Sequence, residues 1–283
     1  MRIQLLIHSR KEEMMKRTMR LSLMGLLGWF FAGSVSLTHA YPNGPLWYVT
    51  DIGPYCAGCH ASTSTKQIPE HPKEFAEQWT IEKKHFADIQ KAQAYQDLSP
   101  DQKDQLIAAI KEVDAHAAIT LDAPSSVKAG QQFAVTVTTQ GGAGPVIGVA
   151  LVDNDLRFQS RPIASTGFLI KAPPKIFGPD GKQQKKWNEM RYNKLDGNIN
   201  FAIVFGVGAD LKNKTFDSTK VQWTLRAPVD PGTYTMAAVF FYGTEKASPL
   251  GTVEQLGRKM PKGGFLAHSG RIMFSKVHTI TVR

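Results

Sequence analysis

Five consecutive residues carry the most specific chemical signal in the chain: Cys56, Ala57, Gly58, Cys59 and His60. They form a C-x-x-C-H motif, the attachment signature of a c-type haem. Two thiols at this spacing can form thioethers with the two vinyl groups of one porphyrin, and the following imidazole can coordinate the iron. The chain has two cysteines, and this motif uses both. We therefore predict one haem c per chain, attached through Cys56 and Cys59, with His60 as an iron ligand.

Two other chemistries also use paired cysteines. A thioredoxin-like disulfide is expected in a βαβ context, whereas turn-forming residues flank this motif, with Gly53 and Pro54 before it and residues 62–64 after it. A structural zinc site takes four ligands, often from two C-x-x-C pairs. The chain has no second pair, although separate histidines could complete a site. Disulfide and zinc are therefore the alternatives to haem.

The residue on the other face of the iron decides between an electron carrier and a site that binds small molecules. Met190 is the first methionine after the motif, and it lies beyond the predicted haem segment, so that segment supplies no methionine ligand. We favour His85, because Ile81 and Ile89 lie one helical turn away on either side of it and such a stripe faces inward. The predicted metal ligands are thus His60 and His85. The alternatives are His71, His116 or an open coordination position.

The first forty residues have the pattern of an export signal. A basic region, residues 2–20, precedes an apolar run, residues 21–37, and small residues surround a cleavage site after Ala40. The run is short for a membrane span, so we predict cleavage before Tyr41 rather than an uncleaved anchor, and no membrane span in the mature chain. Export fits the haem motif, because bacteria attach haem c outside the cytoplasm. The predicted location is periplasmic or extracellular.

The charge of the chain constrains its partners. The formal net charge is +10 for the whole chain and about +6 after the predicted cleavage, and this mildly basic balance suits docking on an acidic redox partner or an anionic surface. No basic and aromatic module typical of nucleic-acid binding accompanies this charge, so we expect no nucleic-acid partner. Residues 171–194 hold seven basic and two acidic residues, and such a run is either a docking patch or a solvated loop. The oligomeric state does not follow from the sequence.

The segment after the motif has helical character. Phe75, Trp79, Phe86 and Ile89 recur at helical spacing, which predicts a helix over 72–98. A second helix should begin with Ser99 as N-cap, followed by Pro100 in the first position and Gln102 three residues after the cap.

The composition changes near residue 118, where alternation of period two begins. The expected strands are Ala118–Leu121, Gln132–Thr139, Val146–Val152, Ile199–Val207, Thr219–Arg226, Thr233–Phe241 and Arg271–Arg283. Turn-forming residues separate most of them, which is typical of an immunoglobulin-like sandwich. The fold class we predict is therefore multidomain, a small all-α cytochrome c-like haem domain followed by an all-β immunoglobulin-like sandwich. The predicted divisions are a signal peptide at 1–40, the haem domain at 41–117 and the sandwich at 118–283.

Four motifs resemble a known group of proteins: residues 55–60, 231–235, 241–245 and 269–274. The group consists of exported bacterial proteins in which a single-haem cytochrome c segment is joined to a reelin-like, immunoglobulin-type sandwich. The first motif is specific for haem, and the others are moderately specific for the sandwich. The resemblance implies the fold and the cofactor, and it implies no defined reaction.

These observations predict an exported cytochrome c that carries single electrons, with the sandwich as a docking or assembly module. Two strong axial ligands would leave no position for a substrate, so we predict no catalytic residues. One alternative is a haem enzyme or gas-binding protein with an open sixth position. Another is an adhesion or assembly protein in which the sandwich is the functional part and the haem is a relay.

Overall fold

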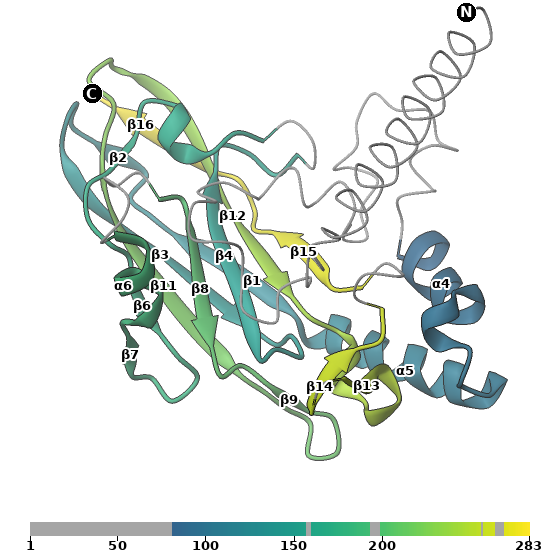
Figure 1. Ribbon diagram of the computed structural model, residues 1–283. Helices are drawn as coiled ribbons and strands as arrows, with labels where there is room; N and C mark the ends of the chain where they lie inside the picture. Colours follow the sequence, from purple (N-terminus) through teal and green to yellow (C-terminus); the bar gives the residue numbers. More distant parts are fainter. Residues whose placement is uncertain (1–80, 157–159, 193–198, 256, 264–268) are drawn as a thin grey trace, which may run out of the picture. The chain divides into compact units, whose positions relative to one another are not determined.

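The computed structural model describes residues 81–283, apart from 157–159, 193–198, 256 and 264–268 (Figure 1). The chain divides into two compact units, residues 1–38 and 39–283, and every described residue belongs to the second. Within the described residues, no helix is both long enough and apolar enough to cross a membrane.

A short helical segment opens the described chain. It comprises a π-helical turn η2 (Glu82–Phe86), α4 (Ala87–Lys91), a 3-10 turn η3 (Gln93–Tyr95) and α5 (Pro100–His116). The predicted cap of the second helix is confirmed: the Gln102 amide donates to the Ser99 hydroxyl, and the Ser99 amide donates to the Gln102 side chain. The single helix predicted over 72–98 is wrong in its described part, because Ala92 adopts an extended conformation and ends α4.

Two sheets follow, each with six described strands. The first has the spatial order β1 (Ala118–Asp122), β3 (Gln132–Gln140), β11 (Ser218–Arg226), β6 (Lys175–Phe177) and β7 (Gln183–Gln184), with β5 (Leu169–Ile170) also paired to β11. The second has the order β2 (Ser126–Val127), β16 (His278–Val282), β12 (Gly232–Tyr242), β4 (Val146–Val152) and β8 (Phe201–Phe205), with β15 (Arg271–Phe274) also paired to β12. Of these pairings, β2 with β16 is parallel and the others are antiparallel.

Smaller elements connect these strands. Two hairpins are formed by β9 (Ala209–Asp210) with β10 (Thr215–Phe216), and by β13 (Thr252–Gln255) with β14 (Arg258–Pro261). The remaining helices are η4 (Ile163–Ser165), α6 (Lys186–Tyr192), η5 (Glu245–Ala247) and η6 (Pro249–Gly251).

One hydrophobic core joins the two sheets and confirms the predicted β-sandwich. Trp223 and Val135 of the first sheet and Val149 and Phe240 of the second have no exposed surface and belong to the same cluster. At the entry to β12, the Tyr234 hydroxyl donates to the Asp230 carbonyl at 2.9 Å. Such a tyrosine corner is typical of immunoglobulin-like sandwiches. Tyr234 belongs to the motif at 231–235, one of the sequence motifs that resemble such a sandwich.

The predicted fold class is wrong in its helical half. We expected a multidomain protein with a separate all-α cytochrome c-like haem domain, but the described residues are mostly strand and their helices are few and short. Val113 of α5 belongs to the sandwich core, and Leu250 of η6 packs against the helical cluster. The physical reason is size: η2 and α4 have five residues each, and helices this short need tertiary packing for stability. The sandwich supplies part of that packing.

The boundary between helices and strands is abrupt. α5 ends at His116, and β1 begins at Ala118. The division of the chain into 41–117 and 118–283 stays a prediction, because most of the first segment lies outside the described residues.

Candidate functional site

The residues of the haem motif lie outside the described part of the chain. This applies to Cys56, Cys59 and His60, and also to His71. Covalent haem attachment at these positions therefore stays a prediction. Among the residues of the predicted site, the structure describes His85 and His116.

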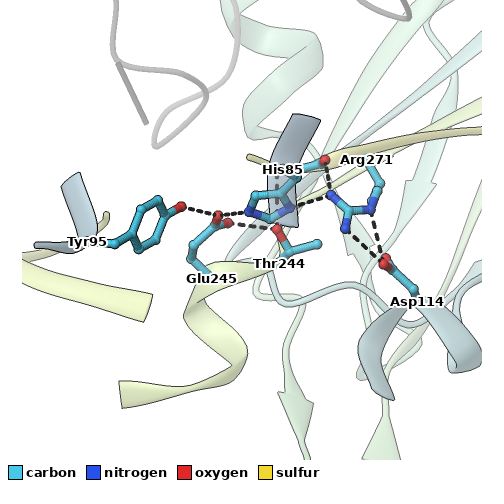
Figure 2. Close-up of polar contacts among 7 residues, drawn as sticks. His85, Tyr95, Asp114, Thr244, Glu245 and Arg271 are labelled. Carbon is cyan, nitrogen blue, oxygen red and sulfur yellow. Dashed lines mark hydrogen bonds and ion pairs between the residues drawn. The ribbon is translucent and has the colours of Figure 1, made fainter. Parts of the chain in front are cut away.

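His85 lies at the centre of a buried polar network (Figure 2). It belongs to η2 and is 2 % exposed. Its Nε2 lies 2.5 Å from Oε1 of Glu245, and its Nδ1 lies 2.7 Å from Nη1 of Arg271. Both partners belong to the sandwich, so one histidine links the helical segment to the end of β12 and to β15.

The guanidinium of Arg271 determines the tautomer of His85. Arginine has donors and no acceptor, so Nδ1 of His85 must accept the hydrogen bond from Arg271. The proton of a neutral imidazole then resides on Nε2, from which it is donated to Glu245. In this arrangement one ring nitrogen uses its lone pair and the other carries a proton.

This arrangement bears on iron ligation by His85. A histidine ligand gives the metal a nitrogen lone pair, and its second nitrogen often donates to a carboxylate. For His85 to bind iron, Nδ1 would have to give up Arg271, or Nε2 would have to give up its proton and Glu245. The assignment of His85 as the second metal ligand stays a prediction. Iron binding by His85 would require the loss of its buried contact with Arg271 or with Glu245.

Glu245 is the most enclosed carboxylate of the network. It is 1 % exposed, and it accepts hydrogen bonds from the Tyr95 hydroxyl at 3.0 Å and the Thr244 hydroxyl at 2.7 Å, besides the contact with His85. Burial acts to raise the pKa of this carboxyl, but the contacts from His85, Thr244 and Arg271 outweigh it and lower the pKa to about 2. The group is therefore an ionised carboxylate inside the protein.

Tyr95 is affected in the opposite direction. Its burial, together with the neighbouring carboxylate of Glu245, raises the pKa of the phenol far above its ordinary value. The hydroxyl of Tyr95 is therefore a fixed hydrogen-bond donor.

Arg271 extends the network to α5. Its Nε and Nη2 lie 3.1 and 3.0 Å from Oδ2 of Asp114, and its Nη1 also donates to the Gly270 carbonyl at 2.9 Å. The Tyr242 hydroxyl donates to Oδ1 of Asp114 at 3.0 Å. Burial raises the pKa of the Asp114 carboxyl, against the lowering effects of Arg271 and Tyr242. The network thus alternates in chemical character, from carboxylate to imidazole to guanidinium to carboxylate.

His116 has a different environment at the end of α5. Its ring stacks on Phe216, with centroids 4.0 Å apart and an interplanar angle of 7°. Its Nδ1 lies 2.9 Å from the carbonyl oxygen of Glu112, and a ring nitrogen facing a carbonyl donates a proton to it. The structure places His116 and His85 in separate contacts and does not bring them together. In the described residues, no group of three or more histidine, cysteine, aspartate or glutamate side chains could hold a metal ion.

A pocket adjoins the network. It is partly open to solvent, and its walls are mostly apolar. Thr244, Glu245 and Arg271 are among the polar residues of its lining, so the network and the pocket share these residues.

Sequence reasoning identified His85 and missed its partners. Glu245 and Arg271 belong to motifs that we used as indications of the sandwich fold. The sequence did contain a signal for a buried ion pair: Arg271 begins the strand R-I-M-F, and Glu245 follows the long apolar strand β12. Charged residues beside such strands are seldom buried unless they are paired.

The comparisons with known proteins give limited information. No protein-family model and no curated protein sequence matches the chain. Among solved structures, the chain shows 13 % identity to the CARDB domain of a protein from Pyrococcus furiosus, solved in complex with di-metal ions, with a TM-score of 0.22. That likeness covers 59 % of this chain and 90 % of the other. At this TM-score the likeness supports no conclusion, and the assignment of a sandwich rests on the strand pairing described above.

Proposed function

We propose that the chain is an exported c-type cytochrome that carries single electrons through one haem, bound covalently at Cys56 and Cys59 with His60 as an axial ligand. The observation that carries this proposal is the C-x-x-C-H motif in a chain whose two cysteines both belong to it. Haem iron alternates between ferric and ferrous states and so accepts and releases one electron. The export signal of the first forty residues supports a periplasmic or extracellular location.

The sandwich has the role of a docking or assembly module in this proposal. The outward face of its first sheet carries Lys175, Lys220 and Arg226, which are all exposed. Basic groups on one face favour an encounter with an acidic redox partner. The proposal assigns the protein no catalytic residues.

The attachment of the haem provides the main test. Haem held by thioethers should stay with the denatured protein during extraction with acidified organic solvent. Cys56→Ala or Cys59→Ala should weaken this retention, and the double variant should abolish it. Complete extraction from the wild type, or the presence of zinc in place of iron, would show that the proposal is wrong.

A second candidate function is a haem protein with an open sixth position, either an enzyme or a gas-binding protein. The specific observation in its favour is that both ring nitrogens of His85 are engaged, by Glu245 and by Arg271. An electron carrier with two histidine ligands should be low-spin in both oxidation states and should not bind carbon monoxide. Rapid binding of carbon monoxide by the reduced wild type would favour the open site.

The His85→Ala variant separates the two roles of this residue. If His85 binds iron, its loss should give high-spin ferric iron and allow carbon monoxide binding. If His85 acts within the polar network, the spin state should stay unchanged while the protein loses stability, because Glu245 would lose a buried donor. His116→Ala is the matched control, since His116 is partly exposed and lies outside the network.

A further inference from the structure

A groove lies on the outward face of the first sheet, where β3, β11 and β6 run side by side. Its lining includes Thr138, Ser218, Lys220 and Phe177. Thr138 is the cross-strand partner of Lys220, and Lys220 is the partner of Phe177. Cross-strand partners point to the same face of a sheet, so a hydroxyl, an ammonium group and an aromatic ring stand in one row. The volume of the groove is about 350 Å³, within the range of roughly 300–1,000 Å³ found for small-molecule sites.

The polar groups of the groove are available to a ligand. Within the described part of the chain, neither the Thr138 hydroxyl nor the Lys220 ammonium has a hydrogen-bond or ion-pair partner. The Ser218 hydroxyl donates to the Thr139 carbonyl at 3.1 Å, and its lone pairs can still accept. The nearest acid of the neighbouring turn, Asp180, is 3.7 Å from the ammonium of Lys182. The groove therefore offers one positive charge and two hydroxyls.

The groove is open rather than closed around a small ligand. Gly178 and Gly181 line it from the turn between β6 and β7, and a Cβ added at Gly181 would meet no atom within 4 Å. The next cross-strand row on the same face consists of Thr136, Gln222 and Lys175. These side chains are polar, and that of Lys175 is exposed. A long, flexible ligand held in the groove can therefore continue across the open face of the sheet.

The combination of groups matches an acidic sugar. One face of a pyranose ring carries C–H groups, which pack on an aromatic ring such as the half-buried Phe177. The ring hydroxyls suit Thr138 and Ser218, and the carboxylate of a uronic acid can form a charge-assisted hydrogen bond with Lys220. A protein partner is favoured less, because the cores of protein interfaces are enriched in aromatic residues, methionine and arginine and depleted in lysine and serine.

We infer that this groove binds an acidic polysaccharide, with one uronic acid unit seated between Phe177 and Lys220. The inference goes beyond electron transfer and does not depend on the haem. It rests on the proposed docking role of the sandwich, and it names the ligand: a negatively charged polymer outside the cytoplasm. Such a ligand would hold the protein on a polymer layer while the rest of the chain stays accessible.

Calorimetric titration of the complete protein with tetragalacturonate tests the inference. Lys220→Ala should weaken binding roughly ten-fold or more, as expected for the loss of a hydrogen bond between charged groups. Phe177→Leu keeps an apolar side chain and removes the ring, and it should weaken binding several-fold. Because Lys220 is exposed, its loss should leave the protein folded, which circular dichroism verifies. Undetectable binding of tetragalacturonate by the wild type at millimolar concentration would overturn the inference.

Lys128→Ala is the matched control for the loss of one positive charge. Lys128 is exposed and lies in the loop before β3. Gln132, the first residue of β3, is six residues from Thr138 along the strand, about 20 Å at the usual rise per residue. Charges more than about 8 Å apart are largely screened at physiological ionic strength, so the affinity should hardly change. Equal losses in Lys128→Ala and Lys220→Ala would show that only net charge matters and that the groove is not the site.

Two altered ligands separate the sugar from its charge. The methyl ester of tetragalacturonate keeps the rings and removes the carboxylate charges, and tetraglutamate keeps four side-chain carboxylates without the rings. Both should bind at least about ten-fold more weakly than tetragalacturonate. Equal binding of tetraglutamate would show a docking surface for acidic proteins and contradict the inference. Retention of the haem is measured separately by extraction, so failure of this inference and failure of the proposed cytochrome are distinguishable.

Discussion

The two sheets of the sandwich differ in how many of their faces are covered. In the first sheet, β3 and β11 alternate between exposed and buried residues along their length, as expected when one face meets solvent. In the second sheet, six of the seven residues of β4 are buried, as are four of the five of β8. The second sheet is thus covered on both faces, and it carries both the pocket and the buried charges.

The two sheets differ in the environment that they give to charged side chains. On an open face, charged side chains such as those of Lys175 and Lys220 are hydrated, and they interact weakly with one another. Arg271 on the covered sheet and Glu245, just after strand β12 of that sheet, have lost water and depend on protein partners. Substitutions should therefore have large effects on the second sheet and small effects on the open face of the first.

The largest effect is expected for Arg271→Ala. Removal of the guanidinium leaves Asp114 without its cation and takes a partner from His85. The loss of one member of a buried ion pair costs roughly 3–5 kcal/mol of unfolding free energy. Lys220→Ala on the open face should stay within about 0.5 kcal/mol of the wild type. Urea denaturation of both variants measures the contrast, and similar midpoints would contradict it.

Glu245→Gln should give a smaller loss that depends on pH. The variant keeps the size of the side chain and removes its charge, so at pH 7 we expect a decrease of about 1.5–3 kcal/mol, the contribution of charge-assisted hydrogen bonds. The pKa of Glu245 is lowered from 4.5 to about 2, so its contribution is complete above pH 4.5 and is lost as the pH falls toward 2.

The titratable or charged groups that act on Glu245 are His85, Tyr95 and Arg271, with Asp114 beyond the arginine. The raised pKa of Asp114 acts in the opposite direction, because protonation of that group in acid favours the folded state. It is present in both proteins, so comparison of wild type and Glu245→Gln isolates Glu245. Their stabilities should converge between pH 4.5 and 2, and a difference that persists unchanged in acid would show that the charge of Glu245 is not the cause.

Gly148→Ala tests the tight packing of the covered sheet. An added Cβ would lie 2.6 Å from Cε2 of Phe201 and 3.2 Å from Cδ2 of Phe241, so both rings would have to move. Overpacking of this kind costs about 1–3 kcal/mol. Thr136→Ala on β3 of the other sheet is the control, because that side chain is only partly buried. An unchanged melting temperature for Gly148→Ala would show that the aromatic rings adjust freely.

Among the variants of the buried network, the smallest effect is expected for Tyr242→Phe. The variant keeps the ring and removes the hydroxyl that donates to Asp114. We expect a loss of about 0.5–1.5 kcal/mol, the usual net contribution of one hydrogen bond. Thermal unfolding followed by circular dichroism suffices for the measurement. A loss as large as that of Arg271→Ala would mean that Asp114 depends on the tyrosine more than on the arginine.

The sequence predicted the long strands well because their signals are local, but the single strand expected over Arg271–Arg283 is wrong, since β15 and β16 are separate strands. The expected strand Val146–Val152 coincides with β4, those near residues 132 and 219 differ from β3 and β11 by one residue at one end, and that near residue 233 is one residue shorter than β12 at each end. Alternation of polar and apolar residues, interrupted by turns, is sufficient for such predictions. The capping box at Ser99 was predictable for the same reason, since it lies within four consecutive residues.

The contacts between the helical segment and the sandwich were not predictable from local patterns. His85 is separated by 160 residues from Glu245 and by 186 from Arg271, and Asp114 is 157 residues from Arg271. Periodicity within one segment contains no information on pairs this distant. We interpreted the apolar stripe around His85 as a surface that faces a haem, whereas in the structure its ring faces a carboxylate and a guanidinium.

The π-helical turn that contains His85 makes the network sensitive to the length of the chain. In η2 the Phe86 amide donates to the Ile81 carbonyl, five residues earlier, and such turns contain one residue more than an α-helical turn. Deletion of a single residue from 82–84 would restore an ordinary α-helix, and each residue of an α-helix corresponds to about 100° of rotation. Ile81 would then be rotated by that angle relative to His85, so the buried positions of both could no longer be kept together, although every side chain of the network would still be present. The extra residue of this π-helical turn therefore sets the orientation of His85 relative to Ile81.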